Sequence, residues 1–411
     1  MAAELQEVLV TTPAQSLHRA VAGRVFGAVP GSAPVRRIHD AIAGDAYTGV
    51  RLAARGAVAA AGLAAHVAAG GREVRPISEH PAGGVLQAAL NGLIGDRMAT
   101  LSNALAVEMA VRHQGRDVAL DGPALEAAFG QATGKVAVFV HGLGENEDAW
   151  KLRVRDRERP DAAIDAGCTY ASRLASDLAY TPVYVRFNSG LHISDNGRRL
   201  SALLAALCTE WPGGVDELLL VGHSMGGLVI RSACHVGDAV QRRWVDAVRH
   251  LVCLGAPHLG APLERFVNAA GWALRAAPET RPFGAILETR SAGIKDLRFG
   301  YLSDEDWAHG DPDALLEDNR HDVPLLEGVH HLFVSATMGR ADTGLLAGLV
   351  GDLLVSAASA TGRDRIPLGV DDLRHLPGVS HLQLLNHPRV YEQMLAWLAR
   401  TSPPERLALN R

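Results

Sequence analysis

The sequence of 411 residues lacks the features that mark several classes of protein. It has no basic excess, because 45 acidic residues against 40 Lys and Arg give a net charge of −5, so no nucleic-acid partner is expected. Its four cysteines show no CxxC or metal-finger spacing, which argues against a disulfide scaffold and a metal or other cofactor site. With 48% hydrophobic and 21% charged residues, the composition predicts a globular protein of enzyme size.

Long hydrophobic runs are also missing. The most apolar stretch, 56–71, is mostly Ala and Gly and falls short of the roughly 20 strongly apolar residues of a spanning helix. The first ten residues, MAAELQEVLV, do not resemble a signal peptide, so we expect a cytoplasmic protein. Residues 1–75 hold eight Arg and five acids, and this local excess of +3 leaves −8 for the remainder. Two interpretations stay open: a small-residue helix packed on its neighbours, which we favour, or peripheral contact with a membrane surface.

From residue 104, short apolar runs alternate with segments of helix length. The first pattern, alternating over 107–112 and resuming at 118–120 after Gln114-Gly115, predicts a β-hairpin. The later runs predict a mostly parallel sheet with helices on both faces, in which ligands bind at the carboxyl ends of strands. These runs are Val136–Val140, Val183–Arg186, Leu218–Val221, Leu251–Leu254 and Leu332–Val334.

The clearest motif follows the third of these runs. Gly222-His223-Ser224-Met225-Gly226-Gly227 lies between an apolar strand and a helical segment that starts with Leu228-Val229-Ile230. This is the pattern of a nucleophile elbow, where backbone strain lifts the Ser224 hydroxyl to the top of the sheet. The GxSxG spacing alone occurs by chance, but the strand before it and the helix after it make it specific.

A serine hydroxyl is a weak nucleophile, so the elbow predicts a histidine base and a carboxylate on later loops. We assign the base to His381, which precedes an amphipathic helix expected over Val390–Leu398, where the last strand should end. Asp352 follows the Leu332–Val334 strand and is the candidate acid, with Asp342 on the same connection as the alternative. The order serine, acid, histidine is that of enzymes with this elbow.

The oxyanion formed by attack on a carbonyl needs backbone N–H donors. One is expected from Met225, directly after the nucleophile. The second should come from the loop after the first parallel strand, where His141-Gly142-Leu143-Gly144 follows Val140, and we choose the N–H of Leu143. A plain tight turn is the competing explanation for the glycines of that loop.

These segments together resemble a known family. VFVHGLGENEDAW (138–150), VGHSMGGLV (221–229), LGAPHLGAPL (254–263) and GVSHLQLL (378–385) look like the α/β-hydrolase superfamily, and most like bacterial lipase-like serine esterases grouped with GPI inositol-deacylases. The resemblance covers roughly residues 104–400. It implies Ser224 as nucleophile, Asp352 as acid, His381 as base, and Leu143 and Met225 as oxyanion donors. One departure is Leu353, where the family often has a second Gly after the acid.

We therefore expect an α/β-hydrolase domain over 104–411 and a helical N-terminal extension over 1–103. A cap insertion is expected at about 259–329, because that connection is too long for a simple loop. Pro262 opens a helix in it with Leu263, Phe266, Val267, Ala270 and Leu274 on one face, which either packs on the body or admits an acyl chain. The acidic segment 304–322 lacks the regular spacing of a calcium loop, so we expect it to be solvated.

The expected activity is hydrolysis of carboxylic esters, with lipids or other apolar acyl esters as substrates. An acyltransferase with the same triad is the first alternative, and a non-catalytic protein that binds a partner or membrane through its first hundred residues is the second. A binding protein would have no need for Ser224, Asp352 and His381 together, so we favour the enzyme.

Overall fold

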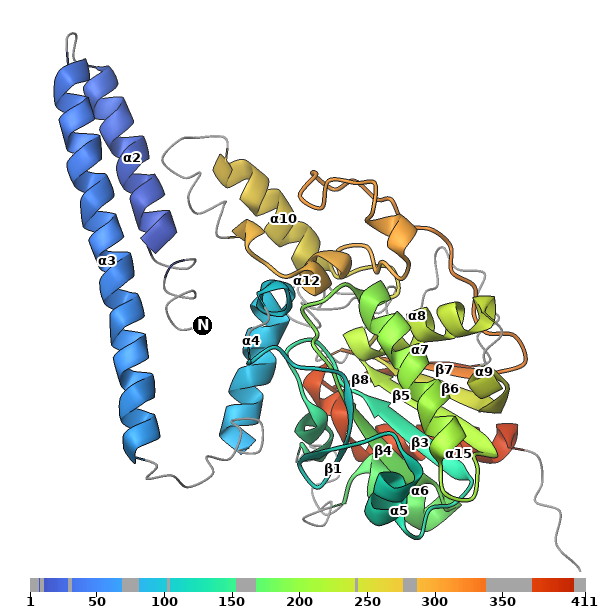
Figure 1. Cartoon of the computed structure of the whole chain (residues 1–411). Helices are drawn as coiled ribbons and strands as arrows, with labels where there is room; N and C mark the ends of the chain where they lie inside the picture. Colours follow the sequence, from blue (N-terminus) through green and yellow to red (C-terminus); the bar gives the residue numbers. More distant parts are fainter. Residues whose placement is uncertain are drawn as a thin grey trace, which may run out of the picture.

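The computed structural model describes residues 7, 11–28, 32–68, 81–101, 104–152, 168–240, 243–275, 287–337 and 372–402. Within these ranges, three α-helices precede the first strand, and strands then alternate with helices up to a last helix (Figure 1). The strands are β1 Ala110–His113, β2 Arg116–Val118, β3 Lys135–Val140, β4 Thr181–Arg186, β5 Glu217–His223, β6 Val248–Leu254, β7 His330–Thr337 and β8 Asp372–Pro377. The helices are α2 Thr12–Gly27, α3 Ala33–Ala68, α4 Pro81–Thr100, α5 Gly122–Phe129, α6 Tyr170–Leu178, α7 Ile193–Glu210, α8 Met225–Ala239, α9 Arg243–Ala247, α10 Pro262–Arg275, α12 Ala292–Asp296 and α15 Pro388–Thr401, with 3₁₀ turns η3 Glu147–Lys151, η4 Asp304–Asp306 and η5 Leu382–Leu385.

One eight-stranded sheet organises the body, in the order β2-β1-β4-β3-β5-β6-β7-β8. Strand β1 is antiparallel to β2 and β4, and the pairs from β4 through β3, β5, β6 and β7 to β8 are parallel. The chain proceeds from β3 outward to β4 and then crosses to the other side of β3 to form β5. The reversal of direction lies between β3 and β5, and open α/β sheets bind ligands at the carboxyl ends of the strands at such a point. The predicted α/β-hydrolase fold is confirmed.

The hairpin at the start of the body forms where the alternation predicts it. Gln114 and Gly115 join β1 to β2 with φ values of 49° and 80°. Two left-handed residues in a two-residue loop are typical of a type I′ turn, whose twist matches that of the strands.

Alternate residues of each strand pack into two hydrophobic cores, one on each face of the sheet. In β3, Val136 and Val138 pack with α7 and α8, whereas Ala137 and Phe139 pack with α6 and α15 on the other face. Strand β5 divides in the same way, with Leu218 and Leu220 on one side and Leu219 and Val221 on the other. Strands buried on both faces are apolar at most positions, which is why the central parallel strands contain the short apolar runs seen in the sequence.

The three N-terminal helices occupy two different places. Helices α2 and α3 form an antiparallel pair that stands beside the α/β body, while α4 lies against it (Figure 1). His18 of α2 and His39 of α3 meet at 3.1 Å between their Nε2 atoms. No helix in the described part of the chain is long and apolar enough to cross a bilayer.

The segment predicted as a cap contains α10, α12 and η4. Helix α12 packs against α4, and α10 lies next to α12 on the side away from α4 (Figure 1). In its acidic part, the buried carboxylate of Asp306 accepts the backbone N–H groups of Leu302, Ser303 and His321, so this acid organises the loop. Asp304 pairs with Arg198 of α7. No group of three or more metal-binding side chains occurs within the described ranges.

Candidate active site

Ser224 occupies a sharp turn between β5 and α8. Its backbone has φ 51° and ψ −121°, a strained combination for a residue with a Cβ. The flanking glycines make the turn compact: a Cβ on Gly222 would come within 2.7 Å of Gly227 Cα, and one on Gly226 would overlap the backbone oxygens of Val140 and His141. Ser224 is partly exposed while its neighbours on both sides are buried. The predicted elbow geometry is therefore present.

The loop after β3 lies directly beside the elbow. A Cβ on Gly142 would be 3.1 Å from Ser224 Cβ, which places the two turns in contact. The N–H groups of Gly142 and Gly144 are engaged, by Glu145 Oε2 at 2.7 Å and Ser189 Oγ at 2.9 Å, and Glu145 N–H donates to Gly142 O. By contrast, the N–H of Leu143 has no acceptor among the described residues.

Met225 offers a second N–H of the same kind. It is the first residue of α8, so its N–H has no partner within the helix, and the described part of the chain supplies no other acceptor. The helix dipole adds partial positive charge at this end. Two unengaged donors, at Leu143 and Met225, thus flank the turn that carries Ser224.

His381 follows β8 and precedes η5. Its ring packs against the backbone of Gly255 after β6, where a Cβ would come within 2.9 Å of Nδ1 and Cε1. Ser224 N–H donates to Leu254 O, the residue before Gly255, at 2.8 Å, so the serine and the histidine approach the same strand end. Asp352 and its alternative Asp342 both lie outside the described residues.

Burial sets the charge state of His381. The side chain is 7% exposed, and burial followed by the positive charge of His223 lowers its pKa to about 3, although Glu145 acts in the opposite direction. A histidine with so low a pKa is neutral around pH 7, which is the form that accepts a proton. The site thus brings together a strained serine, a neutral histidine and two N–H donors.

Two carboxylates that the motifs do not identify lie just after His141–Gly144, the loop predicted to supply an oxyanion donor. Glu145 bonds to His223, and Glu147 is buried between Arg112 and Arg186. Arg186 Nε and Nη2 donate to the two oxygens of Glu147 at 2.6 and 2.5 Å, and Arg112 Nε donates at 2.9 Å. Only the acidic run GENED hints at these groups, because Glu147 is 39 residues from Arg186 and Glu145 is 78 from His223.

Helix α4 packs against the loop after β3, a contact that no sequence motif indicated. Its backbone meets the body without intervening side chains, since a Cβ on Gly92 would lie 2.9 Å from Gly144 Cα and one on Gly190 would lie 2.7 Å from Gly95 N. The helix is kinked at Ile94, where φ is −142°. The carbonyls near the kink accept bonds from Ser291 Oγ and N–H in the cap and from Asn188 Nδ2 after β4.

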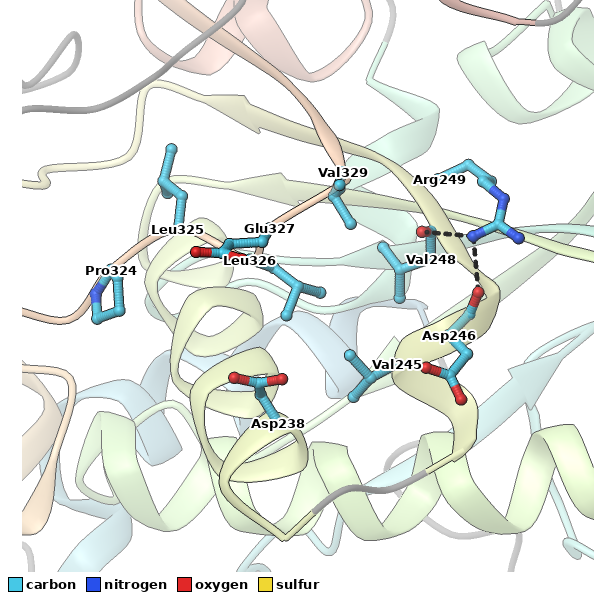
Figure 2. Close-up of a pocket in the computed structure, with 11 residues that line it drawn as sticks. Asp238, Val245, Asp246, Val248, Arg249, Pro324, Leu325, Leu326, Glu327 and Val329 are labelled. Atoms are coloured by element: carbon cyan, nitrogen blue, oxygen red, sulfur yellow. Dashed lines mark hydrogen bonds between the residues drawn. The ribbon is translucent and has the colours of Figure 1, made fainter.

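A hollow of about 420 Å³ lies elsewhere, at the amino ends of β6 and β7 (Figure 2). Its lining contains carboxylates and apolar side chains but no serine, cysteine or histidine, and Arg249 is tied to the backbone oxygens of Asp246 and Val248. It is therefore separate from the chemistry at the elbow. The lining residues are Asp238, Val245, Asp246, Val248, Arg249, Pro324, Leu325, Leu326, Glu327, Gly328 and Val329.

Comparison with known proteins agrees with this architecture. Residues 203–277, which include the elbow, match the family model of the PGAP1-like alpha/beta domain. No curated protein sequence matches the chain.

Solved structures that match part of this chain include the following three proteins. The mature lipase BlEst2 of Bacillus licheniformis is 19% identical with a TM-score of 0.41, over 64% of this chain and 91% of the lipase. A lipase-esterase related protein of Clostridium acetobutylicum is 12% identical with a TM-score of 0.33, over 66% and 95% of the two chains. The esterase Pf2001 of Pyrococcus furiosus is 12% identical with a TM-score of 0.35, over 66% and 83%.

Proposed function

We propose that this chain, an α/β-hydrolase whose residues 203–277 match the PGAP1-like family model, hydrolyses carboxylic esters through an acyl-enzyme on Ser224. The strained backbone of Ser224 at the strand-to-helix turn is the observation that carries the proposal, because strain at one partly exposed serine persists only where the surroundings impose it. The unengaged N–H groups of Leu143 and Met225 support it. We take 104–411 as the catalytic domain, with α4 of the 1–103 extension against its site and 259–329 as its cap.

In the proposed mechanism, Ser224 Oγ attacks the ester carbonyl while His381 takes the hydroxyl proton. The oxyanion accepts hydrogen bonds from Leu143 and Met225, each worth about 3–4 kcal/mol in the transition state. His381 then delivers the proton to the alcohol leaving group, and water activated by the same ring cleaves the acyl-enzyme. Asp352 is proposed to hold the imidazole in the required tautomer.

Apolar acyl esters, including lipids, are the proposed substrates. The amphipathic helix α10 lies in the cap with Val267, Ala270 and Leu274 partly buried, and α4 exposes Val85 and Leu86 by 56% and 54%. Neighbouring apolar side chains left in solvent mark surfaces that meet apolar ligands. A series of p-nitrophenyl esters of increasing acyl length should therefore show kcat/KM rising with chain length. A preference for acetate would contradict this part of the proposal.

Peripheral membrane contact is proposed for the pair α2 and α3. Val35, Ile38 and Ile42 recur at helical spacing on α3 and are 59–64% exposed, and this region carries the basic excess of the chain. The full chain should co-sediment with vesicles that contain anionic lipid, and less so after Ile38→Glu and Ile42→Glu together. Equal sedimentation of the two proteins would refute the contact.

A fluorophosphonate probe gives the direct test of the activity. We expect labelling and ester turnover in the wild type and loss of both in Ser224→Ala. Ser176→Ala, which removes an exposed hydroxyl on α6, should be labelled fully. Equal labelling of wild type and Ser224→Ala would refute the assignment of the nucleophile. Product analysis with added alcohols then separates hydrolysis from the alternative, acyl transfer.

A further inference from the structure

His223, the residue before Ser224, has a hydrogen-bond acceptor at each ring nitrogen. The side chain is fully buried, with Nδ1 at 3.0 Å from Glu145 Oε2 and Nε2 at 3.1 Å from the backbone oxygen of His381. A carbonyl oxygen only accepts hydrogen bonds, so Nε2 must carry a proton, and an ionised carboxylate requires one on Nδ1 as well. A ring with protons on both nitrogens is an imidazolium cation.

The surroundings of Glu145 keep its carboxylate ionised. Burial alone would raise the pKa of Glu145, but the charge and hydrogen bond of His223 and the N–H of Gly142 outweigh it and lower the pKa below its usual value. Gly142 N–H donates to the same Oε2 at 2.7 Å, which stabilises the negative form. Because Glu145 Oε2 already accepts the Gly142 N–H, we place the proton that it shares with His223 on the ring.

We propose that His223 is a positioning residue of the active site: as a buried imidazolium it ties the oxyanion loop, through Glu145, and the base loop, through the His381 backbone, to the nucleophile elbow. The inference rests on the proposed function for its catalytic meaning. Three segments that converge from different parts of the chain, after β3, β5 and β8, are joined by this one side chain. Because Glu145 also holds Gly142 N–H, the bridge orients the turn that presents Leu143.

The cation also acts on the base. The ring centroids of His223 and His381 lie 4.8 Å apart, so the charge on His223 disfavours a second charge on His381. The titratable groups that face His381 among the described residues are His223 from the end of β5 and Glu145 from the loop after β3. His223 therefore has an electrostatic effect that a purely structural side chain would lack.

His223→Gln tests both parts of the role. The variant keeps a donor of similar reach but no charge, so we expect kcat on an ester substrate to fall by roughly 10–100-fold with little change in KM, since loop displacement misplaces the reacting groups. Loss of the cation should also move the acid limb of the kcat/KM profile upward by about one pH unit. Unchanged kcat and an unchanged limb in a folded variant would overturn the proposal.

His250→Gln is the matched control. His250 is also buried on the sheet, bonded to Glu217 Oε1 at 3.1 Å and to Thr401 Oγ1 at 3.0 Å, but in the amino-terminal half of β6. We expect this variant to lose stability while its acid limb stays at the wild-type position. A shift of the same size in both variants would show a general effect of lost histidines and refute the specific role.

The charge state of His223 can be measured without a substrate. In protein labelled with ¹⁵N-histidine, we expect a buried ring with both nitrogens protonated at neutral pH that Glu145→Gln converts to a singly protonated ring, which identifies it as His223. This holds even if His223→Gln does not fold. If this ring carries only one proton in the wild type, the inference about His223 is overturned, whatever the result for ester hydrolysis. If the wild type neither hydrolyses esters nor reacts with the fluorophosphonate probe, the proposed function is refuted, whatever the charge state of His223.

Discussion

The buried carboxylate of Glu147 gives the sharpest test of what stabilises the segment that follows β3. Glu147 is 4% exposed in its side chain, and its partners Arg112 and Arg186 are 3% and 7% exposed. Glu147→Gln keeps the shape but leaves two buried guanidinium groups without this carboxylate. Breaking a buried pair in this way costs about 3–5 kcal/mol. Arg112 retains Asp117 and the carbonyl of Gly115, so the cost falls chiefly on Arg186.

The free energy of unfolding, measured by urea denaturation, is the appropriate quantity. Asp148→Asn supplies the control from the same turn, because Asp148 pairs with Lys151 at 2.6 Å but the two side chains are 38% and 55% exposed. Exposed pairs contribute below about 1 kcal/mol. If Glu147→Gln loses no more stability than Asp148→Asn, the buried network does not stabilise the protein as argued.

The effect of pH provides a second check on the same pair. Burial tends to raise the pKa of Glu147, but the hydrogen bonds and charges of Arg186 and Arg112 outweigh it and hold the pKa below its usual value. A carboxyl whose pKa is lowered by folding stabilises the protein above its unfolded value, about 4.3, and loses this stabilisation as pH falls through the folded value. The difference between wild type and Glu147→Gln should therefore be full at neutral pH and shrink in acid.

Two further predictions concern α4 and the cap. Gly190→Ala should force α4 away from the body, because the new Cβ would lie 2.7 Å from Gly95 N, and we expect a loss of about 1–3 kcal/mol and weaker fluorophosphonate labelling. Gly49→Ala, with open space around it inside helix α3, should leave the labelling unchanged and should not lower the stability. Burial lowers the pKa of His192, but the hydrogen bond to Asp296 outweighs burial and raises the pKa overall. This pair should therefore stabilise the protein fully below about pH 6.5, and the stabilisation should decline as the pH rises. The Tm difference between wild type and His192→Gln should shrink from acid to alkaline pH, and a constant difference would contradict the reasoning.

Local patterns in the sequence were enough to predict the elements that bear the chemistry. The apolar runs identify the buried strands because most positions of a strand that is covered on both faces are apolar. The elbow around Ser224 is recognisable because its turn depends on a few consecutive residues, above all the glycines two places before and after the serine. The hairpin at Gln114-Gly115 is equally local. His381 could be proposed from its place before the last helix, and Asp352, outside the described residues, stays a prediction.

The contacts that organise the site were decided only by the tertiary structure. The GxSxG motif assigns no role to the position of His223. The structure shows that the loops after β3 and β8 contact its ring, through Glu145 on one side and the His381 carbonyl on the other. Likewise, nothing in the sequence of α4 announces that it contacts the loop after β3, and nothing in the sequence around Glu147 announces that it pairs with Arg112 and Arg186. Hydrophobic periodicity and turn chemistry report each residue's immediate neighbours in the chain, whereas these bonds join segments whose proximity depends on strand order, which neither pattern encodes.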